Sequence, residues 1–134
     1  MIKLACCGDD CNYCPRYIGT INNDVDALKK AAEIWYKIGL RDRILSPDEM
    51  KCSGCLFVRE CIYGIKECCE RNKFDNCGYC SEMPCSKLTE AIRKIKEFKD
   101  ISRSILSEEE FNMLKAAFYM KEEYLNKIKN NSKK

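Results

Sequence analysis

Twelve cysteines stand among the 134 residues of the sequence, and histidine is absent. Six of the cysteines form three pairs with the spacing C-x-x-C, namely Cys11 and Cys14, Cys52 and Cys55, and Cys77 and Cys80. Two thiolates at this spacing lie on one tight turn and can bind a single metal ion from the same side. Three such pairs in a short chain therefore predict metal ligation by thiolates.

Glycine lies beside or inside several of these cysteine turns, at Gly8, Gly54 and Gly78. Glycine tolerates a positive φ, so backbone N–H groups there can point at a thiolate sulfur. A single cysteine is more simply a small buried apolar residue. We expect that simpler role for Cys6 and Cys69, each of which directly neighbours another cysteine.

Disulfide bonds are the competing explanation for a chain this rich in cysteine. The amino-terminal residues contain no apolar segment of the kind that directs secretion, and no stretch has the length of a transmembrane span. We therefore expect a cytoplasmic protein without a membrane partner, in which the thiols stay reduced and available to metal.

Charge gives little support for binding nucleic acid. The formal net charge of +3 divides unevenly, with 12 Lys and Arg against 13 Asp and Glu in residues 1–85, and 12 against 8 in residues 86–134. Acidic residues at Glu90, Glu97 and Asp100 interrupt the basic ones of the later part. A solvated helix face explains this mixture better than a nucleic-acid footprint. A protein partner is the more plausible expectation, and no oligomeric state follows from the sequence.

The elements that must position the cysteines are predicted to be helices. We expect residues 1–19 to form a cysteine-containing loop. Apolar residues at helical spacing then predict helices over residues 24–40, 59–72 and 86–99, and a long helix from Ser107. Ser46-Pro47-Asp48-Glu49 is typical of a further, short helix start. Trp35, Phe111 and Phe118 fall on the apolar faces and are expected in the core.

Strands are expected to be short or absent, because the sequence holds only two valines and no clean alternation of apolar and polar residues. The predicted fold class is a mostly α, small single domain over residues 1–134. Its amphipathic helices would be pinned by cysteine-rich metal-binding loops, with the carboxy-terminal helices at about residues 86–130.

Four stretches of the chain together resemble a cysteine-rich prokaryotic family called domain of unknown function 3795. They are CGDDCNYCPRY from Cys7 to Tyr17, KCSGC from Lys51 to Cys55, the stretch from Cys61 to Cys68, and CGYCSEMPCSKL from Cys77 to Leu88. The resemblance covers roughly residues 4–88. It implies that the motif cysteines, and so the candidate metal ligands, are Cys7, Cys11, Cys14, Cys52, Cys55, Cys61, Cys68, Cys77, Cys80 and Cys85. The spacing of Cys61 from Cys68 is longer than the family pattern.

Ten cysteines do not divide evenly into sites of four. One arrangement gathers Cys52, Cys55, Cys61 and Cys68 into a local site. A second site would then join Cys11 and Cys14 to Cys77 and Cys80, with Cys7 and Cys85 beside it.

Zinc and an iron–sulfur cluster both accept four thiolates. Separated C-x-x-C pairs favour zinc, whereas Cys7-x3-Cys11-x2-Cys14-Pro15 only partly matches the compact iron–sulfur motif. We expect structural zinc supporting an interaction module, with an iron–sulfur protein in electron transfer or redox sensing as the alternative. A catalytic role is disfavoured, because catalytic zinc usually keeps histidine or carboxylate ligands and an open position.

Overall fold

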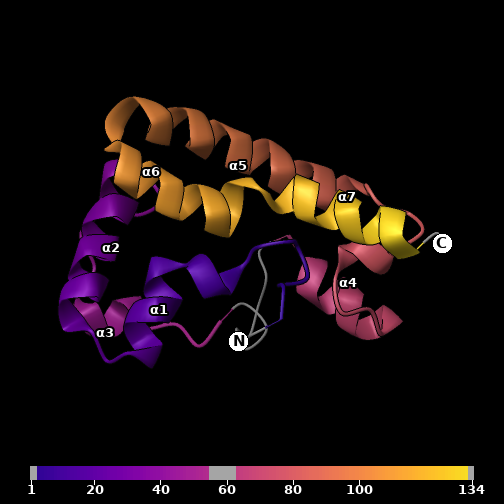
Figure 1. The fold of residues 1–134 in the computed structure, drawn as a ribbon, viewed down its shortest axis with the longest axis horizontal. Coiled ribbons are helices and arrows are strands. Elements are labelled where there is room, and N and C mark those ends of the chain that lie inside the picture. Colours follow the sequence, from indigo (N-terminus) through magenta and orange to yellow (C-terminus); the bar gives the residue numbers. More distant parts are fainter. Residues whose placement is uncertain (1–2, 55–62, 133–134) are drawn as a thin grey trace.

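The computed structural model describes residues 3–54 and 63–132, and the regular structure in these ranges is helical (Figure 1). No strand occurs in them, which confirms the mostly α fold class. The elements are η1 (Cys11–Tyr13), α1 (Pro15–Ile21), α2 (Val25–Lys37), α3 (Pro47–Met50), α4 (Ile65–Asn72), η3 (Cys77–Tyr79), α5 (Ser86–Ile105), α6 (Glu108–Leu114), the π-helical turn η4 (Lys115–Tyr119) and α7 (Lys121–Ser132). Among these helices, none is both long enough and apolar enough to cross a membrane.

Side-chain caps fix the starts of three helices where the sequence predicted them. The Asp24 carboxylate accepts a hydrogen bond of 3.1 Å from the Ala27 amide at the start of α2. Ser46 and Ser107 each form a reciprocal capping box with the glutamate three residues later. Each cap satisfies amides that the first turn of a helix leaves without a partner.

Four predicted boundaries differ from the structure, and the first is the end of α2, which stops at Lys37 although the helix was expected to reach residue 40. Residues 1–19 are not all loop, because Pro15 starts α1 and Gly19 packs so closely on α2 that an added Cβ would lie 2.9 Å from Leu28. The helix expected over residues 86–99 continues to Ile105. In the described part of the predicted helix 59–72, α4 begins only at Ile65, after Gly64 with φ +73°.

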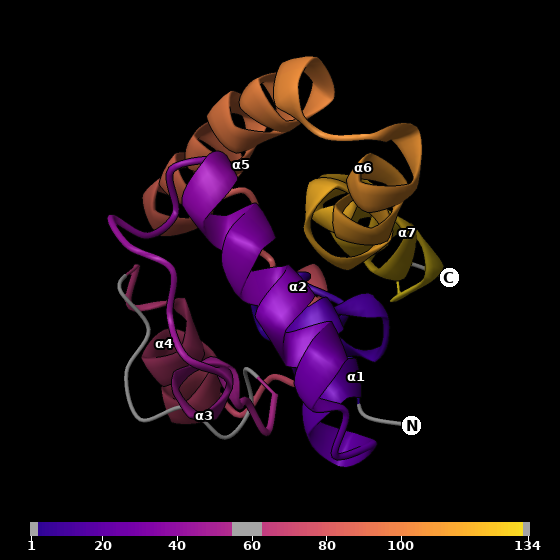
Figure 2. The ribbon, with the colours of Figure 1, turned by 90° about the vertical axis from the view of Figure 1, so that its left-hand side faces the viewer.

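The long helix expected from Ser107 is also interrupted. It comprises α6, the π-helical turn η4 and α7, with Met120 between the last two. Figure 1 shows this series lying alongside α5, so that the two form a long helical hairpin. Helices α1, α2 and α3 lie under one end of the hairpin, and α4 lies under the other; Figure 2 shows α2 crossing between α5 and α6.

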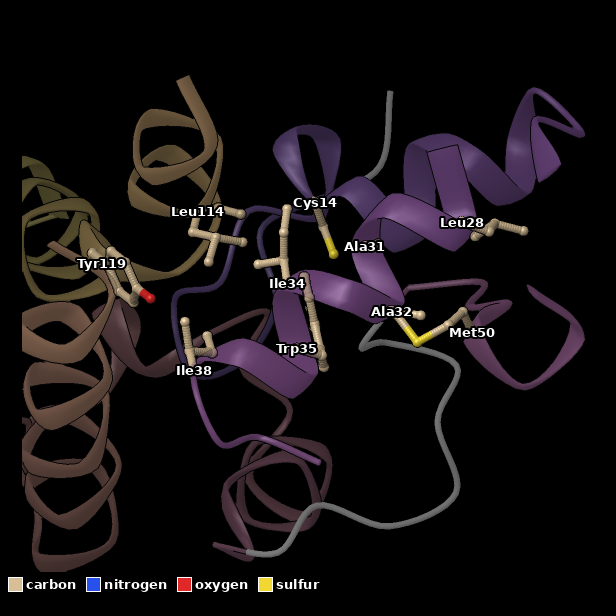
Figure 3. Packing of buried hydrophobic residues seen from close by; sticks show 11 residues of the cluster. Cys14, Leu28, Ala31, Ala32, Ile34, Trp35, Ile38, Met50, Leu114 and Tyr119 are labelled. Atoms are coloured by element: carbon tan, nitrogen blue, oxygen red, sulfur yellow. The ribbon is translucent and has the colours of Figure 1, made fainter. Parts of the chain in front are cut away.

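Each end of the hairpin covers its own buried cluster. The first cluster joins α2 to Leu114, Ala117 and Tyr119, and Figure 3 shows Ile34 and Ile38 facing these helices. The second lies where α5 and α7 meet α4 and η3, and three of its nine buried residues are cysteines: Cys6, Cys69 and Cys77. Thiols therefore occupy core positions there that aliphatic side chains fill in an ordinary domain.

The amino-terminal segment connects the two clusters. The Cys77 amide donates a hydrogen bond of 2.9 Å to the Cys6 carbonyl, and the Asp10 amide donates one of 2.8 Å to the Ala117 carbonyl. Between them, Gly8 has φ +98° and lies so close to α7 that an added Cβ would be 2.9 Å from the Lys121 backbone. Glycine is required here both for the backbone conformation and for the close approach.

Candidate metal centre

Two of the C-x-x-C pairs are built in the same way. Cys11 and Cys77 each begin a single 3-10 turn, and the amides of Cys14 and Cys80 donate hydrogen bonds of 3.1 Å back to their carbonyls. The residue before each turn caps it through a side-chain oxygen, Asp10 in the first case and Asn76 in the second. This tight construction holds the two thiols of each pair on one turn, as thiolate ligation requires.

Cys52, the described member of the third pair, follows α3 and lies near Cys14 of the first pair. The Cys52 amide donates a hydrogen bond of 2.9 Å to the Thr20 hydroxyl on α1, and Arg16 donates one of 2.8 Å to the Met50 carbonyl. The Gly54 amide, at φ +104°, donates to the Cys52 sulfur at 3.4 Å. An amide directed at a cysteine sulfur is the feature that glycine near these turns predicted.

Burial and neighbouring thiols control the protonation of Cys14. The pKa of Cys14 is raised to about 12, mainly by burial and also by the nearby Cys11 and Cys52, although the backbone amides of Tyr17 and Arg16 lower it. Cys11 and Cys52 therefore lie near enough to Cys14 to act on its charge. The buried Cys14 thiol stays protonated at neutral pH until a cation stabilises its thiolate.

A second group of thiols surrounds the Cys77–Cys80 turn. The sulfurs of Cys69 and Cys77 lie 3.9 Å apart, and both residues are buried. Cys6 contacts Cys69, and the pKa of Cys6 is raised first by that hydrogen bond and then by burial. These contacts bring the thiols of Cys6, Cys69 and Cys77 together in the second cluster.

A small cavity of about 20 Å³ lies within this second group. Five cysteines contribute to its wall: Cys68, Cys69, Cys77, Cys80 and Cys85. They come from α4, from η3 and from the residue that precedes α5, so three separate elements meet there. The remaining wall is apolar, formed by Phe74, Met83 and Leu88. A space of this size accommodates a single water molecule or ion.

The described residues do not form a complete metal site in this conformation. Within residues 3–54 and 63–132, no group of three or more Cys, Asp or Glu side chains is arranged to hold a metal ion. The predicted ligands Cys55 and Cys61 lie outside the described residues. Metal pinning of the loops therefore stays a prediction.

Cys7 packs against the second cluster and lies beside a buried ion pair. The ammonium of Lys121 lies 2.8 Å from the Asp9 carboxylate and 3.9 Å from the Cys7 sulfur. Burial alone would lower the pKa of Lys121, but Cys7 and Asp9 outweigh it and raise this pKa above its ordinary value. Lys121 thus stays charged in the interior, with its ammonium in contact with the Cys7 sulfur.

The structure groups the thiols differently from the sequence-based division. Cys14 and Cys52 line the same cavity, because Arg16 and Thr20 hold the end of α3 against α1. Cys68 belongs to the wall around Cys77 and Cys80. Spacing along the chain could not show this, since both groupings use the same C-x-x-C turns.

The contacts that three residues near the thiols make were not predicted from the sequence. Cys6 and Cys69 are buried, as expected, but they also contact other thiols. Lys121 was not singled out, although it falls on the apolar stripe that runs through Leu114 and Leu125 of the last helices. A lysine on a core-facing stripe needs a buried anionic partner, and that signal could have identified the Asp9 pair.

The fold and these thiol groups define a small, helical, cysteine-rich protein. The chain belongs to the family described as protein of unknown function (DUF3795), whose profile matches residues 3–90. This confirms the resemblance seen in the cysteine motifs. No curated protein and no solved structure matches the chain.

Proposed function

We propose that this protein is a cytoplasmic metal-binding protein in which structural zinc, held by cysteine thiolates, stabilises a helical interaction module. The observation that carries the proposal is the gathering of distant cysteines into two separate groups. One is centred on Cys14 and the other on Cys77, and each contains a 3-10 turn of the same construction. Unrelated buried thiols have no reason to share this local build.

Each group supplies a set of ligands for one zinc ion. The first site would use Cys11, Cys14, Cys52 and Cys55, and the second Cys68, Cys77, Cys80 and Cys85. Each set combines one of the paired 3-10 turns with cysteines from another part of the chain, which is the usual design of a structural zinc site. Four thiolates around Zn²⁺ carry a net charge of −2, which amide donors such as that of Gly54 would partly offset.

Zinc would supply stability that the core itself lacks. Cysteines fill a third of the buried positions in the second cluster. Structural zinc contributes on the order of 10–16 kcal/mol to the folding of small metal-dependent peptides, comparable with or greater than the net stability of a typical domain. A zinc ion bound by four thiolates has no open position for a substrate, so the proposed role is non-catalytic.

Exposed aromatic residues on the two cysteine turns support a role in binding a protein partner. Tyr13 is 52% exposed and Tyr79 is 49% exposed, and each occupies the same position in its 3-10 turn. Tyrosine is enriched at the centres of protein interfaces, where its ring adds contact area at a small entropic cost. A metal-rigidified turn would present each ring in a fixed orientation.

The proposal is tested by purifying the protein without oxygen and measuring zinc, iron and absorption together. We expect a colourless protein with two zinc ions per chain. Cys14→Ser and Cys80→Ser should each lose one zinc, because each removes a ligand from a different site. Cys6→Ala is the matched control, since Cys6 is buried but belongs to neither set, and it should retain both ions.

Two results would contradict the proposal. A brown protein with iron and broad absorption near 400 nm would indicate an iron–sulfur cluster and redox chemistry instead. Loss of both zinc ions in either serine variant, with the fold intact by circular dichroism, would show that the two sets of ligands are wrong.

A further inference from the structure

A second and larger cavity lies between α2, α5 and the segment of α6 and η4, and it borders the first thiol group at Cys14 and Cys52. Its volume is about 360 Å³. Most of its wall is apolar and comes from these helices, including Trp35, Ile38, Phe98, Leu114 and Phe118. Figure 3 shows Trp35 and Ile38 on α2 opposite Leu114 and Tyr119. Cavities of this size and character are typical of small-molecule sites.

The charged residues in the wall are strongly biased toward one sign. Among the residues that the structure describes, four cationic side chains contribute to it, Arg16, Arg41, Lys94 and Lys121, and one carboxylate, that of Asp9. Asp9 and Lys121 form the buried ion pair described above, with side chains 14% and 6% exposed. Their charges offset each other, so the wall keeps an excess of positive charge. A low-dielectric wall strengthens the field that such an excess produces.

Two of the cations are suited to contact a ligand. Arg41 donates a hydrogen bond of 2.8 Å from one guanidinium nitrogen to the Leu40 carbonyl, and this bond uses one of the five N–H donors of the group. Lys94 lies 3.7 Å from Glu97 in an exposed ion pair, which water weakens. Arg16 is instead occupied with the carbonyls of Met50 and Glu49 and fixes the wall.

The aromatic part of the wall is rigid. The π-helical turn η4 places both Phe118 and Tyr119 at the cavity, and π-helical turns are often found at functional sites. Phe118 packs edge-to-face on Trp35, with ring centroids 5.9 Å apart. The Tyr119 phenol lies 2.5 Å from the buried Ser102 hydroxyl. These contacts hold the rings in place before any ligand arrives, which lowers the entropic cost of binding.

We propose that this cavity binds a small amphipathic anion, with an aromatic or aliphatic body against the rings and one anionic group at Arg41 and Lys94. Cys14 and Cys52 of the first proposed zinc site also contribute to the wall, but the contacts proposed for the anion involve neither thiol. A carboxylate, sulfonate or phosphate would satisfy the same two cations through charge-assisted hydrogen bonds.

The chain carries its own reporter, since Trp35 is its single tryptophan and lies in the cavity wall. The probes are 8-anilinonaphthalene-1-sulfonate and N-phenyl-1-naphthylamine, which share an aromatic skeleton but differ in the sulfonate. We expect the sulfonate probe to bind with saturation at one per chain and to quench Trp35 by energy transfer. Arg41→Gln combined with Lys94→Gln should weaken it about tenfold, as expected for lost charge-assisted bonds, and leave the uncharged probe unchanged.

The matched control combines Arg43→Gln with Lys96→Gln. Both residues are exposed, lie two positions from the tested ones and do not contribute to the cavity wall. This control should bind both probes as the original protein does. Ala91→Leu adds volume at a buried wall position and should reduce binding of both probes while far-UV circular dichroism stays unchanged.

The proposal is overturned if the sulfonate probe binds at several sites without saturation. It is equally overturned if both pairs of charge variants weaken binding alike, because general surface charge then attracts the probe. Failure of Trp35 to respond to a bound probe would place binding elsewhere.

Discussion

The buried pair of Lys121 and Asp9 allows a sharp test of the packing between the amino-terminal segment and α7. The Lys121→Met change keeps the length of the side chain and removes its charge, so the Asp9 carboxylate, only 14% exposed, loses a partner at 2.8 Å. Breaking a buried ion pair from one side costs about 3–5 kcal/mol, because the other charge stays desolvated. We expect a loss of this size, equivalent to a fall in Tm on the order of 10 °C.

The assay is urea denaturation followed by circular dichroism, with the slope m used to check that the unfolded state is unchanged. Lys127→Met, on an exposed position of the same helix, is the matched control and should alter stability by less than about 0.5 kcal/mol. Combining Asp9→Asn with Lys121→Met should recover most of the loss, since neither charge then remains buried alone. A cost below about 1 kcal/mol for Lys121→Met would refute the view that this pair is desolvated.

Three further predictions concern the helices and their caps. Ser102→Ala removes a fully buried hydroxyl that bonds the phenol of η4 at 2.5 Å, and thermal unfolding should show a loss of about 1–3 kcal/mol. Gly78→Ala would place a Cβ 2.7 Å from a methyl carbon of Ile128 and so force η3 away from α7. The free energy of unfolding, measured by urea denaturation, should fall by about 1–3 kcal/mol. The Arg43 guanidinium, followed by the Ser46 backbone amide, lowers the pKa of Glu49 to about 2. The stabilisation from this ionised carboxylate is therefore complete above its ordinary pKa near 4.5 and is lost as pH falls toward 2.

Each of these predictions has a matched check. Ser104→Ala removes an exposed hydroxyl from the same helix and should change stability little. Ile128→Ala introduced with Gly78→Ala should relieve part of the clash, and an unchanged cost would point to another cause. Arg43→Gln should raise the Glu49 midpoint in an NMR titration of its carboxyl carbon; a midpoint that stays near 2 would show that Arg43 is not the main cause.

Local signals made much of the fold predictable. Helix starts were predictable, because the backbone amides of a first turn need a capping side chain and Asp24, Ser46 and Ser107 supply one. Capping depends only on residues that are close in the sequence. The long apolar stripes of α2 and α5 were equally visible. The start of α1 at Pro15 was missed, because the surrounding cysteines suggested a loop although proline commonly occupies the first position of a helix.

The candidate site was less predictable, because its grouping depends on contacts between distant residues. The C-x-x-C turns identify which thiols share a turn, but nothing in their spacing reveals that Thr20 and Arg16 bring Cys52 to Cys14. The cavity beside Trp35 was likewise hidden, since its wall combines residues from helices that periodicity assigns only to a general core. Tertiary packing, and not local preference, determines both features.

The hydrogen bonds at Cys6 and Asp10 give the amino-terminal segment a mechanical role. The bond at Cys6 connects the segment to Cys77 in the second cluster, and the bond at Asp10 connects it to Ala117 in η4. A pulling force on these five residues would therefore act on both clusters. The segment also contributes to the interior, since Cys6 is one of the buried residues of the second cluster. Loss of either hydrogen bond would therefore weaken the connection between the two clusters, and loss of the bond at Cys6 would also disturb the packing of the second one.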